Sequence, residues 1–208
     1  MPQIRNVAIF IFPEVEVLDF AGPYEVFATS RDKNDGQTHL FNVYNVAENA
    51  EPLVARNGFR VVPNYSFADM PKPDILLIPG GNGTRSLIND ASIIRWIQQQ
   101  NTQTELTLSV CTGALLLGKA GLLENLKATT YHTAFDLLAE LSPTTTLDRE
   151  ARFIDNGRVI TSAGVSAGID MALYTVARLH GRAQARFTAE YMEYDHWDAD
   201  KFAAGLPE

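Results

Sequence analysis

The sequence contains one cysteine among its 208 residues. A single cysteine cannot form an intramolecular disulfide, so we expect a reducing, cytoplasmic location. The four histidines show no metal-ligand spacing, and one thiol is too few for a typical zinc site. We therefore expect no metal and no cofactor.

Positive charge is also scarce. The chain has 17 Lys and Arg against 25 Asp and Glu, a formal net charge of −8, and no window is dominated by basic residues. Nucleic-acid binding needs clustered positive charge, so we expect no nucleic-acid partner. Uncharged apolar runs stay below the ~18 residues of a membrane helix, and residues 1–5 lack the layout of a secretory signal. The sequence thus predicts neither a membrane segment nor secretion.

What remains is the composition of an ordinary globular protein. Apolar residues make up 46% of the chain and charged residues 20%, which excludes disorder. A chain of this length buries roughly 70% of its unfolded surface. No linker, repeat or low-complexity tract divides it, so we predict a single domain over residues 1–208.

Buried strands alternate with helices along the chain. Continuous apolar runs at 7–12 and 75–78 are typical of strands covered on both faces, and 106–110 is predicted as a further buried strand. Segments with helical periodicity lie between or after these strands, for example over 93–100 and 167–179. This order predicts an α/β protein, a three-layer α/β/α sandwich with a mainly parallel central sheet.

Chemically distinctive residues follow three of these strands. Asp19 comes shortly after the first, Gly80-Gly81-Asn82-Gly83 follows the second, and Cys111 follows the third directly. Ligands of open α/β sheets bind outside the carboxyl ends of the strands. We therefore expect the candidate site at that edge of the sheet.

Cys111 has two interpretations. It could be a small buried apolar residue. Its position between a strand and a helix, in Val110-Cys111-Thr112-Gly113, instead resembles a nucleophile elbow. A thiol at a helix N-terminus is expected to have a lowered pKa, which favours a reactive thiolate.

The neighbouring candidates are also open to two interpretations. Gly80, Gly81 and Asn82 could form a tight turn, or an anion pocket in which backbone N–H groups and that of Thr112 stabilise charge. Asp19 could cap a helix, or be a partly buried carboxylate that transfers protons. His132 could be a base or a hydrogen-bonded structural residue.

Five motifs in this order resemble the ThiJ/PfpI superfamily over about residues 7–192. The motifs are Phe12–Pro23, Ile78-Pro79-Gly80-Gly81, Val110–Ala114, Lys127–Thr130, and Ile160–Gly164 with Ala167–Asp170. The resemblance implies a flavodoxin-like fold related to class I glutamine amidotransferases. Phe12–Pro23 together with Cys111-Thr112-Gly113 is most similar to isonitrile (isocyanide) hydratases, lyases that add water to R–N≡C and give an N-substituted formamide.

The resemblance also implies roles for individual residues. Cys111 would attack the isocyanide carbon, Asp19 would transfer protons, and Thr112 would hold the water. Many relatives have Thr-Thr-His where this chain has Thr129-Thr130-Tyr131, so Tyr131 or the displaced His132 would contact the substrate. We expect a small-molecule substrate and, by resemblance, a homodimer.

Other functions use similar motifs. A glyoxalase or deglycase acting on α-oxoaldehydes and a cysteine redox sensor are the alternatives to the hydratase. Related motifs also occur in the ligand-binding half of some AraC-type regulators, and we expect this chain to lack their DNA-binding half.

Overall fold

A mostly parallel seven-stranded sheet forms the centre of the protein. The computed structural model describes residues 4–208, so residues 1–3, on which the secretory-signal argument partly depends, lie outside the described part. The strand order is β10-β11-β7-β6-β1-β2-β5, and only β10 and β11 pair antiparallel. The strands are β1 (Arg5–Phe10), β2 (Phe41–Ala47), β5 (Tyr65–Ser66), β6 (Ile75–Ile78), β7 (Leu106–Val110), β10 (Phe153–Asp155) and β11 (Val159–Ser162). The predicted mainly parallel sheet is confirmed.

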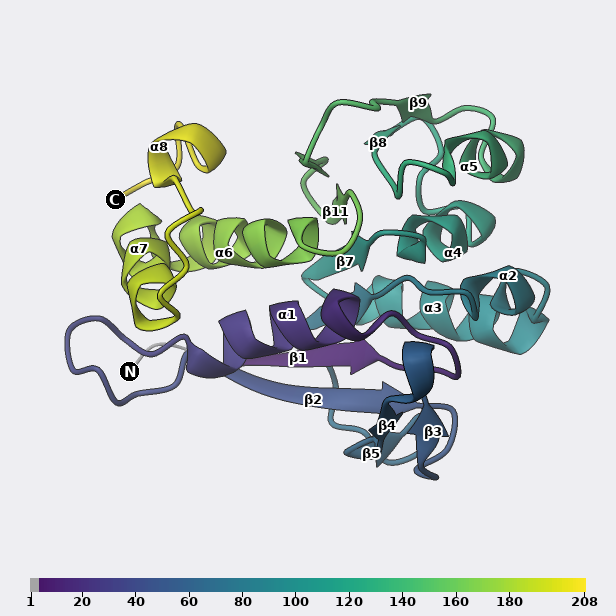
Figure 1. Cartoon of the computed structure of the whole chain (residues 1–208), viewed down its shortest axis with the longest axis horizontal. Coiled ribbons are helices and arrows are strands. Elements are labelled where there is room, and N and C mark those ends of the chain that lie inside the picture. Colours follow the sequence, from purple (N-terminus) through teal and green to yellow (C-terminus); the bar gives the residue numbers. More distant parts are fainter. Residues whose placement is uncertain (1–3) are drawn as a thin grey trace.

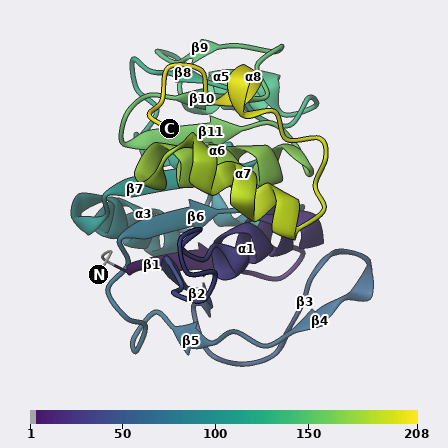
Figure 2. The same ribbon diagram turned by 90° about the vertical axis from the view of Figure 1, so that its left-hand side faces the viewer.

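Helices flank this sheet in two groups. Helix α1 (Val17–Thr29) contacts α6 (Ala167–His180) and α7 (Arg182–Tyr191), whereas α4 (Gly113–Lys119) contacts α2 (Thr84–Leu87), α3 (Ala91–Gln103) and α5 (Phe135–Leu141). Figure 1 shows the two groups toward opposite sides of the view, and Figure 2 shows α1, α6 and α7 together. Every residue of β6 and β7 is buried, including the polar Thr107 and Ser109 of β7, and burial on both faces explains the continuous apolar sequence of β6.

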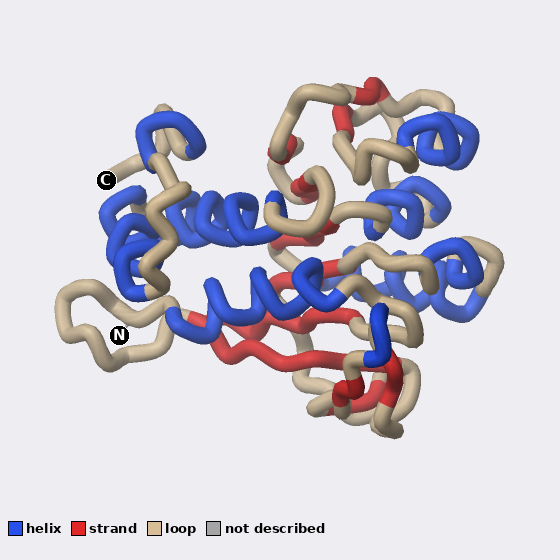
Figure 3. Tube along the Cα trace, in the orientation of Figure 1, coloured by secondary structure: helices blue, strands red, loops and turns tan. Residues whose placement is uncertain are grey.

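The elements outside the central sheet and its main helices are short. Two-stranded sheets pair β3 (Leu53–Val54) with β4 (Arg60–Val61), and β8 (Lys127–Ala128) with β9 (Thr146–Leu147). A 3-10 turn, η1 (Arg56–Gly58), joins β3 to β4, and α8 (Ala199–Phe202) lies near the C-terminus. Figure 3 shows these pieces at the periphery of the main sheet. Such short segments carry too few residues for a clear periodicity.

Helix α1 has a proline in its interior. It starts at Val17, so Pro23 lies beyond its first turn. Proline has no N–H, so the helix lacks the hydrogen bond that residue 23 would donate to the carbonyl of Asp19. Helix α1 packs against α6 and β2 in spite of this missing backbone hydrogen bond.

The topology brings the three chemically distinctive strand ends together. Strands β7, β6 and β1 are consecutive neighbours and run parallel, so their carboxyl ends share one edge of the sheet.

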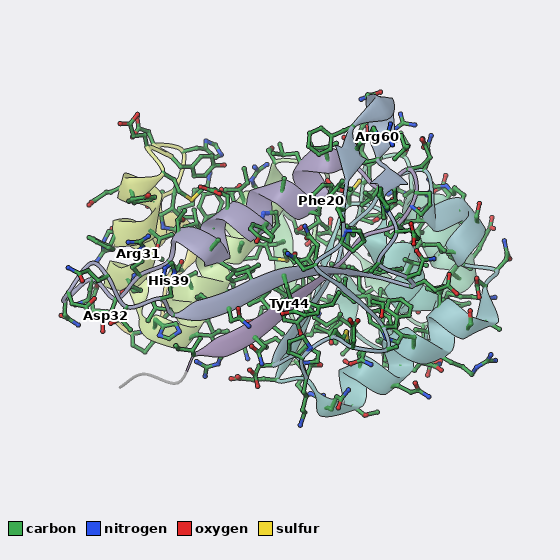
Figure 4. All side chains as sticks on the ribbon, turned by 90° about the horizontal axis from the view of Figure 1, so that it is seen from below. Phe20, Arg31, Asp32, His39, Tyr44 and Arg60 are labelled. Atoms are coloured by element: carbon green, nitrogen blue, oxygen red, sulfur yellow. The ribbon has the colours of Figure 1, made fainter. Side chains whose placement is uncertain are left out.

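Figure 4 shows the α1–β2 loop, with Arg31 and His39, at the far end of the molecule from Arg60 of β4. No helix within residues 4–208 is long and apolar enough to cross a membrane.

Candidate active site

Cys111 occupies a strained turn between β7 and α4. Its φ is 57°, in the left-handed region that non-glycine residues seldom adopt. Its N–H lies 3.2 Å from the Ser162 carbonyl and 3.1 Å from that of Ala163, and its own carbonyl accepts a hydrogen bond from Thr130 Oγ1 at 2.8 Å. These bonds hold the strained conformation, as expected for a nucleophile elbow.

Gly113 allows α4 to begin directly against the neighbouring strand. A Cβ at this position would lie 2.0 Å from the carbonyl oxygen of Ile78 in β6. A side chain would therefore collide with backbone, which cannot move without disturbing the sheet. The glycine after Thr112 is thus required by the close approach of two elements.

Asp19 is a buried carboxylate in the first turn of α1. Its side chain is 0% exposed, and Oδ2 accepts a hydrogen bond of 3.0 Å from the Gly80 N–H. The other oxygen, Oδ1, is buried without a conventional hydrogen-bond partner. The N-cap of α1 is Glu16, so Asp19 does not cap this helix. Of the two interpretations, the buried carboxylate is the one observed.

Burial and proximity shift the pKa values of Asp19 and Cys111 together. Burial raises the pKa of Asp19 from its ordinary 3.8 to about 7, although the Gly80 N–H and the Cys111 thiol lower it. Burial, followed by the charge of Asp19, raises the pKa of Cys111 to about 12. The N–H groups of Thr112 and Val165 act in the opposite direction but are weaker.

The prediction of a thiol with a lowered pKa is therefore wrong. The thiol is 5% exposed and faces a carboxylate, and together these outweigh the donors at the start of the seven-residue α4. At neutral pH the thiol keeps its proton, while Asp19 is close to the midpoint of its titration. The two groups titrate as a coupled pair, and ionising the sulfur means moving a proton to Asp19.

The glycine-rich turn supports this pair through two of its backbone N–H groups. The Gly80 N–H is bonded to Asp19, and the Gly81 N–H donates to Thr112 Oγ1 at 2.9 Å. Two of the donors that the sequence assigned to developing charge, the N–H groups of Gly80 and Gly81, are thus already used. A Cβ on Gly80 would lie 2.6 Å from the Thr112 nitrogen and 2.8 Å from Asp19 Oδ2. Gly80 is therefore the residue that lets Asp19 and Thr112 come together.

A cavity of about 160 Å³ opens beside Cys111. Its lining residues are Glu16, Arg56, Gly81, Asn82, Arg85, Cys111, Thr112, Tyr131, Thr133 and Val165. A larger cavity of about 470 Å³ is lined by residues such as Phe12 and Leu53, and neither Cys111 nor Asp19 is among its lining residues. The smaller cavity is therefore the candidate substrate site. Within residues 4–208 no group of three or more His, Cys, Asp or Glu side chains is arranged to hold a metal ion.

Tyr131, and not His132, lines this cavity. The ring of Tyr131 packs on Gly164, where a Cβ would lie 2.3 Å from Tyr131 Cδ2. His132 is exposed and lies outside the cavity, with its ring centroid 4.2 Å from that of Tyr131. The assignment of His132 to substrate binding is thus not supported by its position. Of these two neighbouring rings, only that of Tyr131 borders the cavity, which the sequence left undecided.

Several lining residues were not predicted from the sequence. Val165 has a φ of 50°, and its N–H lowers the pKa of both Cys111 and Asp19. The motif that ends at Gly164 indicates this loop but does not identify the strained residue that follows it. Glu16, Arg56 and Arg85 come from elements too short or too irregular to place by periodicity.

The fold and the site define an α/β protein of the flavodoxin-like, class I glutamine amidotransferase-like type, with a thiol–carboxylate pair at a nucleophile elbow. The chain belongs to the DJ-1/PfpI family, whose profile matches residues 5–178. The resemblance to ThiJ/PfpI proteins is therefore confirmed.

Similar proteins include both enzymes and regulators. An isonitrile hydratase of Pseudomonas putida is 35% identical over 203 residues, which cover 98% of this chain and 83% of that protein. A transcriptional regulator of Pseudomonas aeruginosa, CdhR, is 28% identical over 82% of this chain and 49% of its own length. The crystal structure of a ThiJ/PfpI family protein from Pseudomonas syringae superposes with a TM-score of 0.82 at 31% identity, covering 93% of this chain and 76% of that one.

Proposed function

We propose that this protein is an isocyanide hydratase that converts R–N≡C and water into the N-substituted formamide R–NH–CHO. The observation that carries the proposal is the Cys111–Asp19 pair, which holds a nucleophile and a proton carrier beside one small cavity. The 35% identity to an isonitrile hydratase over nearly the whole chain supports the same activity.

The chemistry of isocyanides suits this pair. The terminal carbon of R–N≡C accepts a nucleophile and a proton at the same atom, so both must arrive at one place. A thiol whose proton is shared with an adjacent carboxylate supplies both groups there. A free thiolate is not required, which agrees with the raised pKa of Cys111.

The first step forms a covalent intermediate. The Cys111 sulfur bonds to the isocyanide carbon, and the thiol proton passes through Asp19 to that carbon, giving the thioimidate R–N=CH–S–Cys111. In the second step water adds to the same carbon while Asp19 accepts its proton and returns a proton to nitrogen. The C–S bond then breaks while the hydroxyl proton passes through Asp19 to the sulfur, so that R–NH–CHO leaves and the thiol is regenerated.

Thr112 and Tyr131 would position the reacting groups. The Thr112 hydroxyl accepts from the Gly81 N–H and lies 3.2 Å from both the Gly81 carbonyl and Thr84 Oγ1. This network fixes the Thr112 side chain on the cavity wall. Tyr131 forms part of the same wall.

The decisive experiment compares the wild type with Cys111→Ala and Cys111→Ser on an aliphatic isocyanide, on methylglyoxal and on peroxide. Formamide from the wild type alone, with a transient mass increase equal to one isocyanide, supports the hydratase. Lactate from methylglyoxal without formamide would overturn it in favour of a glyoxalase. Neither product, with peroxide-driven mass gain at Cys111, would overturn it in favour of a redox sensor.

We also propose that the protein forms a homodimer. Val54, Phe59 and Val62 are large apolar side chains that are about half exposed or more, and Leu18 at the start of α1 is 39% exposed. Backbone hydrogen bonds from residue 14 to 54 and from residue 56 to 15 join these segments. A second copy covering them would remove this apolar surface from water.

Light scattering tests this proposal. The wild type should have twice the mass of one chain, and Phe59→Ser should lower the measured mass toward that of one chain. A monomeric wild type would refute the proposal.

A further inference from the structure

The wall of the active-site cavity carries two arginines that differ in their partners. Arg56 lies 3.5 Å from a carboxylate oxygen of Glu14 and 3.9 Å from one of Glu16, so its charge is compensated. Arg85 lines the same cavity, and no carboxylate of residues 4–208 lies within ion-pair distance of it. Its guanidinium is therefore an uncompensated positive charge on the cavity wall.

Arg85 is held at the cavity by a buried group. Its Nη1 donates to Thr84 Oγ1 at 3.1 Å, and Thr84 is 0% exposed. Thr84 Oγ1 in turn bonds to the Gly81 carbonyl at 2.8 Å and lies 3.2 Å from Thr112 Oγ1. The guanidinium is thus tied to the hydrogen-bonded chain that ends beside Cys111. A guanidinium has five N–H donors, so four remain for a ligand.

Groups of both charges lie near the cavity. Asp19 lies behind Cys111 and carries partial negative charge at neutral pH, whereas Arg85 provides positive charge on the wall. A volume of about 160 Å³ corresponds to about five water molecules at ~30 Å³ each. A ligand of this size that reaches Cys111 has only a short chain between its reacting atom and the guanidinium.

We propose that Arg85 binds an anionic group on the substrate, and that the substrates are short isocyano carboxylates. Arginine recognises carboxylates through paired N–H donors, which matches the donors left free on Arg85. The isocyano group in this inference rests on the proposed hydratase activity. The carboxylate group rests on Arg85 alone.

The test compares isocyanoacetate with its neutral methyl ester. We expect the wild type to have a kcat/KM at least tenfold higher for the carboxylate than for the ester. Arg85→Gln should raise KM for isocyanoacetate about 10- to 100-fold, the usual worth of a hydrogen bond to a charged group, with kcat little changed and with the ester affected less than threefold. Arg95→Gln is the matched control, because Arg95 is exposed on α3 and does not line the cavity.

A binding measurement separates this inference from the hydratase proposal. Calorimetry with N-formylglycine, the expected product, should give at least tenfold weaker binding to Arg85→Gln than to the wild type or to Arg95→Gln. Such a result without turnover of either isocyanide would support Arg85 and overturn the hydratase. Equal turnover of acid and ester, unchanged in Arg85→Gln, would support the hydratase and overturn the role of Arg85.

Discussion

Replacing Asp19 with asparagine removes a buried carboxylate that has a pKa of about 7. Asparagine has nearly the same shape, and its side-chain oxygen can still accept the hydrogen bond from the Gly80 N–H. The substitution therefore deletes the titration and the proton transfer while leaving the packing in place. We expect it to stabilise the fold above pH 7 and to lower activity by about 10²- to 10⁴-fold.

The size of the stabilisation follows from the shift in pKa. The folded protein raises the pKa of Asp19 from 3.8 to about 7, so the folded state binds this proton more tightly than the unfolded state. The contribution of Asp19 to stability is full below pH 4 and declines as the pH rises through 7. At about 1.4 kcal/mol per pH unit, ionised Asp19 lowers the free energy of unfolding by about 4 kcal/mol above pH 7. Asparagine does not titrate and avoids this loss.

The assay is urea unfolding of the wild type and Asp19→Asn at pH 4, 5.5 and 8. Taking the difference between the two proteins at each pH cancels the titration of every other group. The free energy of unfolding of the variant relative to the wild type should rise by about 4 kcal/mol from pH 4 to pH 8. Glu140→Gln, which removes an exposed carboxylate on α5, should show a difference that hardly changes with pH.

Two results would refute this reasoning. A difference between Asp19→Asn and the wild type that is the same at pH 4 and pH 8 would show that burial does not raise the pKa of Asp19. Full formamide-forming activity in Asp19→Asn would show that this carboxyl group does not carry the proton.

Three further predictions concern the site and its supports. The kcat/KM of the wild type should rise about tenfold per pH unit below 7 and level off above it, because ionised Asp19 accepts the thiol proton; a flat profile from pH 5 to 8 would contradict this. Gly113→Ala should lower the free energy of unfolding by several kcal/mol, because its Cβ would meet the backbone of β6 at 2.0 Å. Gly36→Ala, with a φ of 63° and open space around it, should cost only about 1 kcal/mol, so similar melting temperatures for the two variants would refute the collision. Arg152→Gln should cost about 2 kcal/mol in urea unfolding, because it removes the ion-pair partner of the fully buried Asp170; no measurable change would show that the pair adds nothing to stability.

The sequence indicated the fold because the relevant signals are local. The apolar run at 75–78 has no polar face, a pattern expected of a strand that is covered on both sides. The position of Cys111 between the predicted strand at 106–110 and the following helix was likewise enough to predict a nucleophile elbow, and the strained φ of 57° agrees with it.

The sequence alone determined the α/β architecture and the three strand ends that meet at the site. Only the tertiary structure decided their chemistry. The raised pKa values of Asp19 and Cys111 depend on burial and on each other, although 92 positions separate them in the chain. The bonds that occupy the Gly80 and Gly81 N–H groups, and the choice of Tyr131 over His132, depend on contacts between distant segments. Electrostatic free energies follow distances in space, which periodicity along a chain does not encode.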